Sequence, residues 1–265
     1  MRALWLSLML VMSVTALASP DYAREKKWDD EVSPGIVVGE PVYLEQKNRH
    51  KFLGIYTEAA NAKMGLVVVH GVGIHPDMGI IGTLRQRLPN HGYTTLSIQM
   101  PILAADVRGE PYIKLFPEAV ERLRLAVAYL KSRGHQRIAL VSHSMGSRMS
   151  HGYMVGNPAG VVAWAALSAG TGPGPIITYN EIRARILDLY GANDEPPVLA
   201  GAAARKASLK GNAASRQVMI PDADHFFANY EEAMVKTVKD FLDGVEVARE
   251  QHSQSTGLGV PHADV

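Results

Sequence analysis

The sequence predicts an α/β fold in which a mostly parallel sheet is covered by helices on both faces. Between residues 64 and 242, short apolar runs alternate about five times with segments of helical spacing. The runs, such as the one from Gly65 to Val69, are rich in β-branched residues and do not alternate in polarity. This is typical of strands that are buried on both faces. A chain of 265 residues with 47% hydrophobic residues can also build one sizeable core.

The expected elements follow one another in a regular order. Two alternating stretches within residues 36–57 flank a polar run and predict an antiparallel hairpin. Later apolar runs predict strands at residues 65–69, 93–100, 137–141, 161–167, 185–190 and 217–220. The segments between them have a helical period and predict helices at residues 80–88, 117–131, 145–155, 197–209 and 226–242. Only about 17 residues separate the strands that end at 167 and begin at 185, so we expect little or no cap.

The N-terminus has the features of an export signal. Arg2 precedes an apolar stretch from Ala3 to Val14, and Ala16-Leu17-Ala18 supplies the small residues that signal peptidase requires. We therefore expect residues 1–18 to be a cleaved signal peptide, with no stable membrane anchor afterwards. The alternative is a membrane anchor, but the apolar run is shorter than the roughly 20 residues of a spanning helix. The chain has no Cys for disulfides or lipid attachment, which fits a bacterial periplasmic or secreted protein.

The two ends of the processed chain differ from the region between them. Residues 19–35 are charged, bounded by prolines and without an apolar period, so they predict a flexible leader. Residues 36–245 would form a single α/β domain. Residues 246–265 are polar with Gly and Pro and predict a disordered tail.

Charge and motifs exclude several classes of function. The 27 basic and 26 acidic residues give a formal net charge of +1, without the basic excess of a nucleic-acid-binding protein. Arg122 and Arg124 are interpreted as ordinary solvated charges. The sequence has neither a Gly-x-x-x-x-Gly-Lys-Ser/Thr phosphate loop nor a His-Glu-x-x-His zinc motif. We therefore expect no cofactor and no metal, and the sequence leaves the oligomeric state open.

The strongest chemical signal is Ser142-His143-Ser144-Met145-Gly146, between a predicted strand and a predicted helix. Small-x-Ser-x-Gly in this position is typical of a nucleophile elbow, a sharp turn that lifts the serine hydroxyl above the sheet. The residues two before and two after the serine must be small, and Ser142 stands where Gly is more common. We predict that Ser144 is a nucleophile. The alternative is a Ser-rich turn that caps a helix.

Two later strand ends supply the partners that a serine nucleophile needs. Asp194 follows the strand at 185–190 and would orient a histidine, with Glu195 as the nearest rival and helix capping as the alternative role. His225 follows the strand at 217–220 and would accept the proton of Ser144. A surface histidine at a helix start is the alternative. The chain order serine, acid, histidine supports the catalytic interpretation.

The run His70-Gly71-Val72-Gly73 follows the first buried strand. We expect the backbone amides of Val72 and Met145 to form an oxyanion hole. Glycines at positions 71 and 73 would let the backbone approach a substrate closely. A plain turn is the alternative for this run. We also expect His75 to contact substrate, although His75 and Asp77 could equally be polar loop residues.

These stretches together resemble the α/β-hydrolase superfamily over about residues 36–245. The resemblance is carried by His70-Gly71-Val72-Gly73, Ser142-His143-Ser144-Met145-Gly146, Gly191-Ala192-Asn193-Asp194 and Asp224-His225. The run from His70 to Asp77, with Leu84-Arg85 and His91-Gly92-Tyr93-Thr94-Thr95-Leu96, is similar to an uncharacterised proteobacterial branch of capless exported members. Members of that branch have no assigned substrate, so the closer resemblance adds no reaction.

The sequence therefore predicts a carboxylesterase-like serine hydrolase that cleaves an ester or thioester through an acyl-enzyme. Its partner would be a small-molecule acyl substrate and not nucleic acid. Amides and acylated polysaccharides stay open as substrates. A dienelactone-type enzyme would carry Cys as its nucleophile, and the chain has none. The alternative from another class is a non-catalytic binding or scaffold protein on the same fold.

Overall fold

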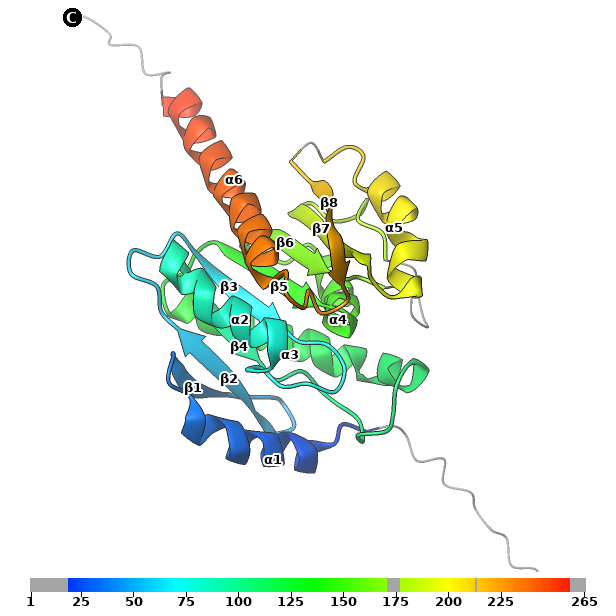
Figure 1. Cartoon of the computed structure of the whole chain (residues 1–265). Helices are drawn as coiled ribbons and strands as arrows, with labels where there is room; N and C mark the ends of the chain where they lie inside the picture. Colours follow the sequence, from blue (N-terminus) through cyan, green and yellow to red (C-terminus); the bar gives the residue numbers. More distant parts are fainter. Residues whose placement is uncertain (1–18, 171–176, 213, 258–265) are drawn as a thin grey trace, which may run out of the picture.

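A computed structural model describes residues 19–170, 177–212 and 214–257 (Figure 1). The expected signal peptide at 1–18 lies outside the described residues. Eight strands form one sheet in the order β1-β2-β4-β3-β5-β6-β7-β8. Their bounds are β1 Glu40–Glu45, β2 Lys51–Thr57, β3 Met64–Val69, β4 Tyr93–Ile98, β5 Ile138–His143, β6 Val161–Leu167, β7 Arg185–Asn193 and β8 Arg216–Asp224.

The strands from β3 to β8 run parallel, whereas β1 and β2 form an antiparallel hairpin and β2 pairs antiparallel with β4. The predicted fold class and the predicted N-terminal hairpin are therefore confirmed. The helices are α1 Tyr22–Val32, α2 Gly79–Arg87, α3 Phe116–Ser132, α4 Met145–Met154, α5 Pro196–Ser208 and α6 Glu231–Gly257. Between β6 and β7, the described residues 168–170 and 177–184 contain no helix, so no helical cap is found in that part of the segment.

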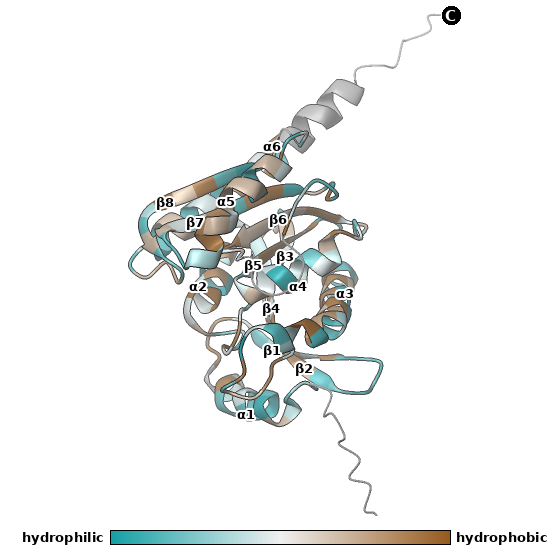
Figure 2. Cartoon of the chain, turned by 90° about the vertical axis from the view of Figure 1, so that its right-hand side faces the viewer, coloured by the Kyte–Doolittle hydropathy of each residue, from teal (hydrophilic) through white to brown (hydrophobic). Residues whose placement is uncertain are grey.

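Helices cover both faces of the sheet because successive strand side chains point to opposite sides. Leu66 and Val68 of β3 pack with α2 and α6 on one face, whereas Val67 and Val69 pack with α3 and α4 on the other. Figures 1 and 2 show this layering, with hydrophobic stretches (brown) along the strands. Burial on both faces explains why these strands lack an alternating pattern.

The segment expected to be a flexible leader forms helix α1 instead, and it packs beside β2 (Figure 1). Glu25 on its inner side is only 4% exposed. Both of its carboxylate oxygens accept hydrogen bonds from Arg122 of α3, at 3.0 and 3.1 Å. Arg122 is fully buried, so the interpretation of its charge as solvated is wrong. An ion pair rather than an apolar stripe anchors α1, which is why hydrophobic periodicity does not reveal it.

The C-terminal segment also differs from the sequence prediction. Helix α6 begins at Glu231, five residues later than expected, because a turn with positive φ at Phe227 (52°) and Asn229 (65°) precedes it. The helix then continues to Gly257, so residues 246–257 are helical rather than a disordered tail. The remainder of the expected tail, residues 258–265, lies outside the described residues.

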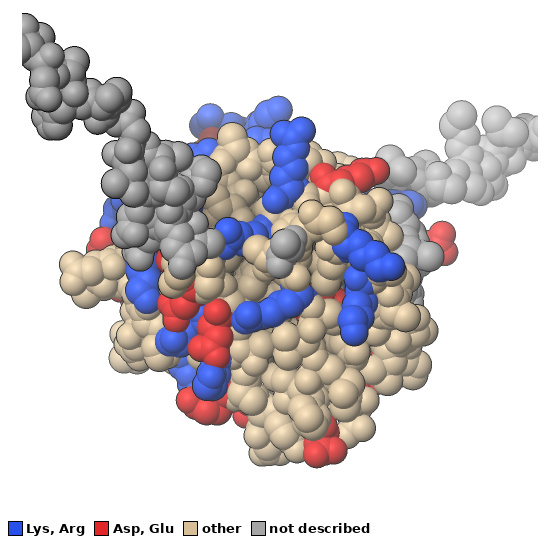
Figure 3. Space-filling model, turned by 90° about the horizontal axis from the view of Figure 1, so that it is seen from above, with Lys and Arg blue, Asp and Glu red and all other residues tan. Residues whose placement is uncertain are grey.

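The surface carries charges of both signs. On the face seen from above in Figure 3, basic and acidic side chains lie interspersed among uncharged ones. Within the described part of the chain, no helix combines the length and the apolar character needed to cross a bilayer. Several large apolar side chains are about half exposed, among them Met78 and Phe226. Both lie beside the carboxyl ends of the parallel strands, where the candidate site is found.

Candidate active site

Ser144 occupies the sharp turn between β5 and α4. Its backbone has φ 55° and ψ −122°, a conformation that is strained for any residue with a side chain. Gly146 makes this turn possible, because an added Cβ would lie 2.4 Å from the carbonyl oxygen of His70. The turn lifts the Ser144 side chain out of the sheet, as the motif predicts.

Ser142, which stands where Gly is more common, has a structural role of its own. It is fully buried, and its hydroxyl oxygen accepts a hydrogen bond of 2.7 Å from the indole nitrogen of Trp164 on β6. The same hydroxyl donates to Oγ of Ser147 on α4 at 3.2 Å. Ser142, in place of Gly, therefore links β5, β6 and α4 by hydrogen bonds beneath the turn, and Ser144 keeps its position in the turn.

The structure brings the three predicted catalytic side chains together. Nε2 of His225 lies 2.9 Å from Oγ of Ser144, and Nδ1 of the same ring lies 2.6 Å from Oδ1 of Asp194. They come from the carboxyl ends of β5, β7 and β8, which are distant in the sequence but end at the same edge of the sheet, with β6 between β5 and β7. Asp194 and His225 are 4% and 8% exposed, so this hydrogen-bonded pair is largely shielded from water.

Asp194 is held by more than His225. Its Oδ2 accepts a hydrogen bond of 2.6 Å from the hydroxyl of Ser168, and its Oδ1 accepts one of 2.7 Å from the backbone amide of Glu195. Burial acts to raise the pKa of Asp194, but the hydrogen bonds from His225 and Ser168 outweigh it and lower the pKa below its usual value. Asp194 is therefore ionised at neutral pH, as an acid that stabilises an imidazolium must be.

Ser168 makes a contact with Asp194 that the sequence did not predict. It follows β6 directly, has a positive φ of 48° and is fully buried. Its hydroxyl fixes the carboxylate of Asp194 from the side opposite His225. A small polar residue at a strand end was the available signal, but only the pairing of β6 with β7 places it next to the acid.

The structure also distinguishes the acidic rivals. The side chain of Glu195 lines the site but makes no hydrogen bond to His225 among the described residues. Asp188 lies inside β7, where both of its oxygens accept from Nε of Arg205 at 3.0 Å. Asp188 is thus part of a buried structural ion pair, and Asp194 is the acid that the geometry selects.

The expected oxyanion-hole residues lie on either side of Ser144. Val72 and Met145 both line the cavity, and no acceptor in the described part of the chain binds either backbone amide. An added Cβ on Gly71 would lie 3.2 Å from Cβ of Ser144, so glycine keeps this loop close to the nucleophile. Two free amides beside the serine can bind the negative oxygen of a tetrahedral intermediate.

His143 is a second residue at the site that the prediction did not assign. Its Nε2 donates to the carbonyl oxygen of His225 at 2.9 Å, and the two rings lie 4.8 Å apart. Burial lowers the pKa of His143 to about 4, so the ring is neutral at pH 7. A neutral His143 can support the backbone of His225 without placing a second positive charge beside it.

His75 does not reach the cavity, in contrast to the predicted substrate contact. Its ring packs edge-on against Trp28 of α1 at 5.7 Å, and its Nδ1 accepts from the amide of Asp77. Helix α1 holds His75 outside the cavity through this contact with Trp28, and sequence patterns did not predict that α1 packs there. Gly73 likewise does not line the cavity, whereas Gly71 does. Gly73 instead borders Arg108, because an added Cβ would lie 3.2 Å from Nη2 of that residue.

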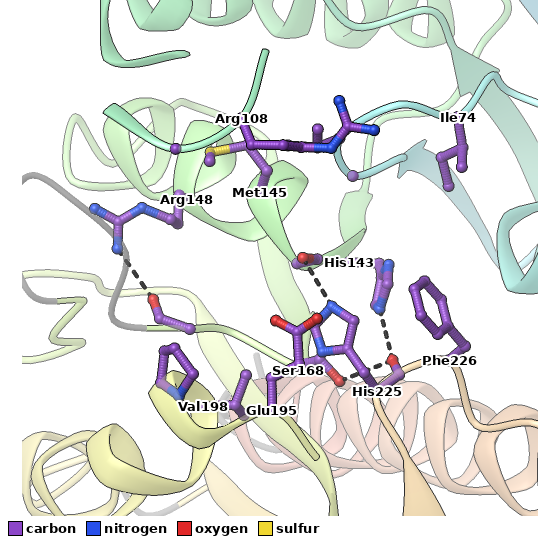
Figure 4. A pocket seen from close by; sticks show the side chains of 16 residues that line it. Ile74, Arg108, His143, Met145, Arg148, Ser168, Glu195, Val198, His225 and Phe226 are labelled. Carbon is purple, nitrogen blue, oxygen red and sulfur yellow. Dashed lines mark hydrogen bonds between the residues drawn. The ribbon is translucent and has the colours of Figure 1, made fainter. Parts of the chain in front are cut away.

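The cavity at Ser144 has a volume of about 310 Å³ and a mainly apolar lining (Figure 4). Charged side chains enter it at three places, namely Arg108, Arg148 and Glu195. This is the size of a site for a small molecule with a few placed polar groups. Among the described residues, no group of three or more His, Asp or Glu side chains is arranged to hold a metal ion.

No protein-family model matches the sequence, and no curated protein matches it either. Solved structures with a similar fold do exist. Est1E from Butyrivibrio proteoclasticus superimposes with a TM-score of 0.63 at 16% identity, over 78% of this chain and 99% of its own. A dienelactone hydrolase from Anabaena variabilis gives a TM-score of 0.62 at 19% identity, over 76% of this chain and 96% of its own.

A third similar structure is XC6422 from Xanthomonas campestris, described as an α/β serine hydrolase without lid. It gives a TM-score of 0.61 at 12% identity, over 78% of this chain and 95% of its own. At such identities the likeness concerns the fold. Together with the strand order and the strained serine turn, it shows that this chain has the α/β-hydrolase fold.

Proposed function

We propose that this chain is a serine hydrolase of carboxylesterase type, which cleaves an ester or thioester through an acyl-enzyme. One observation carries the proposal. His225 lies within hydrogen-bond distance of Ser144 through Nε2 (2.9 Å) and of Asp194 through Nδ1 (2.6 Å). A histidine held between a hydroxyl and an ionised acid is the arrangement that activates a serine nucleophile. Solved structures of the same fold that are described as a dienelactone hydrolase and as a serine hydrolase without lid support this interpretation.

In the first half of the reaction, Oγ of Ser144 attacks the substrate carbonyl while Nε2 of His225 takes the hydroxyl proton. The carbonyl oxygen becomes negative and receives the amides of Val72 and Met145. Asp194 stabilises the positive charge on His225. The intermediate then collapses, the bond to the leaving oxygen or sulfur breaks, and His225 returns the proton to that atom.

In the second half, a water molecule takes the place of the leaving alcohol or thiol. His225 removes a proton from this water as it attacks the acyl-enzyme, and the same two amides bind the new oxyanion. Collapse releases the carboxylic acid, and His225 returns its proton to Oγ of Ser144. The amides matter in both halves, and a single oxyanion donor is worth about 10²–10³ in rate.

Labelling with a fluorophosphonate tests the nucleophile. The purified protein is treated with the reagent and the adduct is located by mass spectrometry, with Ser144→Ala as the matched control. We expect one adduct on Ser144 in the wild-type protein and none in the variant. A folded wild-type protein without an adduct on Ser144 would overturn the proposal and favour a non-catalytic binding protein.

A panel of p-nitrophenyl esters of increasing acyl length, with a matched thioester and anilide, tests the class of bond. We expect turnover of the ester and thioester with the shortest acyl groups, because the cavity of about 310 Å³ accommodates a small acyl group. Hydrolysis of the anilide at the rate of the ester would show an amidase instead.

We also propose that the protein is exported to the periplasm or secreted after removal of residues 1–18. The support is the charged start, the apolar run and Ala16-Leu17-Ala18. Expression in a bacterial host followed by intact mass of the periplasmic protein tests this. A mature N-terminus at Ser19 supports export, whereas an intact Met1 in the cytoplasmic or membrane fraction contradicts it.

A further inference from the structure

We propose that the cavity binds an ester that carries a carboxylate, and that Arg108 is the residue that recognises this anionic group. The proposal deepens the hydrolase function and rests on it for its kinetic consequence. Anion binding by Arg108 can be measured separately, because it requires no turnover. The argument starts from the position of Arg108 in the fold.

Arg108 lies in the loop that follows β4, next to the loop that follows β3 and carries Val72. Both loops lie at the carboxyl ends of neighbouring parallel strands, and Arg108 lines the same cavity as Ser144. Figure 4 shows its side chain on the side of the cavity opposite His225 and Glu195. A substrate whose carbonyl is at Ser144 can therefore extend one end across the cavity toward Arg108.

The guanidinium group is anchored but not neutralised. Its Nη1 donates to the backbone carbonyl oxygens of Ala105 and Val107, at 2.7 and 2.9 Å. Among the described residues no carboxylate forms an ion pair with it, although Asp106 and Glu110 are close in sequence. Nε and Nη2 of Arg108 have no hydrogen-bond acceptor among the described residues. Two donors in a planar fork match the two oxygens of a carboxylate.

Gly73 keeps this fork accessible. Any side chain at position 73 would start 3.2 Å from Nη2 of Arg108, and the positive φ of 75° at this glycine is unfavourable for other residues. The neighbouring residue in the chain is Val72, which carries one of the expected oxyanion amides. Nη2 therefore faces the loop that holds the reacting carbonyl, rather than bulk solvent alone.

The other charges at the cavity agree with an anionic ligand. Arg148 also lines it, but its Nη1 donates to the carbonyl of Gly170 at 3.0 Å, and Figure 4 shows it pointing away from His225. It adds positive potential without taking the place of Arg108. Glu195, the remaining charged residue, lies on the other side of the cavity. An apolar site with an excess of positive charge favours anions, since low-dielectric walls strengthen the attraction.

Matched pairs of esters that differ only in a carboxylate or a carboxamide test the proposal. One pair is monomethyl glutarate and methyl glutaramate, with the charge on the acyl side. The other is 3-acetoxybenzoate and 3-acetoxybenzamide, with the charge on the alcohol side. In at least one pair we expect kcat/KM to favour the anion about tenfold, which corresponds to about 1.4 kcal/mol. Arg108→Gln should abolish this ratio.

Arg124→Gln is the matched control, because it removes one exposed arginine on α3 that lies outside the cavity. We expect it to leave the ratio unchanged, which separates recognition by Arg108 from a general effect of net charge. Raising the ionic strength should lower the wild-type ratio. Equal kcat/KM for anion and amide in both pairs, or an unchanged ratio in Arg108→Gln, would overturn the proposal.

Binding without chemistry separates this proposal from the hydrolase function. In Ser144→Ala, NMR titration with glutarate should shift resonances of the cavity, the neutral diamide glutaramide should not, and the added Arg108→Gln change should abolish the response. Glutarate binding without any labelling of Ser144 in the wild-type protein would retain the anion site and reject the hydrolase. Labelling of Ser144 without glutarate binding would retain the hydrolase and reject the anion site.

Discussion

Nδ1 of His70 lies 2.7 Å from the carbonyl oxygen of Gly71, and Nε2 of the same ring lies 2.8 Å from the amide nitrogen of Met100. An amide N–H can only donate, so Nε2 is the acceptor and Nδ1 carries the proton that it donates to Gly71. Burial lowers the pKa of His70 to about 3, so the ring stays neutral at pH 7. The carbonyl of Gly71 and the amide of Val72 belong to one planar trans peptide. His70 therefore sets the direction of the Val72 N–H.

We predict that His70→Leu lowers kcat by about tenfold or more with little change in KM, since a misdirected oxyanion donor weakens transition-state stabilisation. His70→Asn should recover part of the loss, because its side-chain amide can donate from the position of Nδ1. Steady-state kinetics on a p-nitrophenyl ester, with thermal unfolding of each variant, provide the measurement. A leucine variant with wild-type kcat, or an asparagine variant no better than leucine at equal stability, would show that His70 only fills space.

The two neighbouring carboxylates at the end of β7 should differ sharply in their effect on activity. Asp194→Asn should lower kcat by about 10⁴, because the amide stabilises the wrong tautomer of His225. Glu195→Gln should lower it by less than tenfold, since Glu195 makes no bond to His225 in the described structure. The same ester assay on both variants decides the matter. A larger loss at Glu195 than at Asp194 would reassign the acid.

The buried ion pair between Glu25 and Arg122 predicts a stability effect from a segment far from the site. Glu25→Ala leaves Arg122 buried with a hydrogen bond to Glu118 but without its bidentate partner, and should cost about 3–5 kcal/mol in unfolding free energy. Lys26→Ala on the exposed side of α1 should cost less than about 0.5 kcal/mol. Urea unfolding of both variants provides the comparison. Equal, small losses would mean that α1 is only loosely attached.

Asp243 of α6 gives a prediction for the dependence of stability on pH. Burial acts to raise the pKa of its carboxyl group, but hydrogen bonds from Lys239, Tyr93 and Lys63 lower it further, from 3.8 to about 2. A lowered pKa in the folded state stabilises the protein above the unfolded value, and this stabilisation is lost as the pH falls toward 2.

We therefore expect Asp243→Asn to lower the unfolding free energy by about 1 kcal/mol at pH 7, the usual net value of a partly exposed hydrogen-bonded carboxylate. The difference from the wild-type protein should shrink between pH 4 and pH 2. Urea unfolding of both proteins at pH 7, 4 and 3 measures it. A difference that grows as the pH falls would contradict the assigned ionisation of Asp243.

Local sequence determined much of this protein. The β-branched runs predicted the parallel strands, because burial on both faces removes any alternation. The small residue at 146 and the strand and helix around Ser144 predicted the strained turn. The order Ser144, Asp194, His225 predicted the triad, because each residue directly follows a strand and parallel strands end at one edge of the sheet.

Tertiary structure decided what depends on neighbours that are distant in the chain. Helix α1 has no apolar stripe, and only the buried Arg122 on α3 shows why it folds onto the domain. That docking takes His75 out of the site, while the pairing of β6 with β7 brings Ser168 to Asp194. The path of the loop after β4 places Arg108 at the cavity, and no pattern in the sequence predicts that position. Apolar periodicity records which face of an element is buried, but ion pairs and hydrogen bonds between elements leave no period in the sequence.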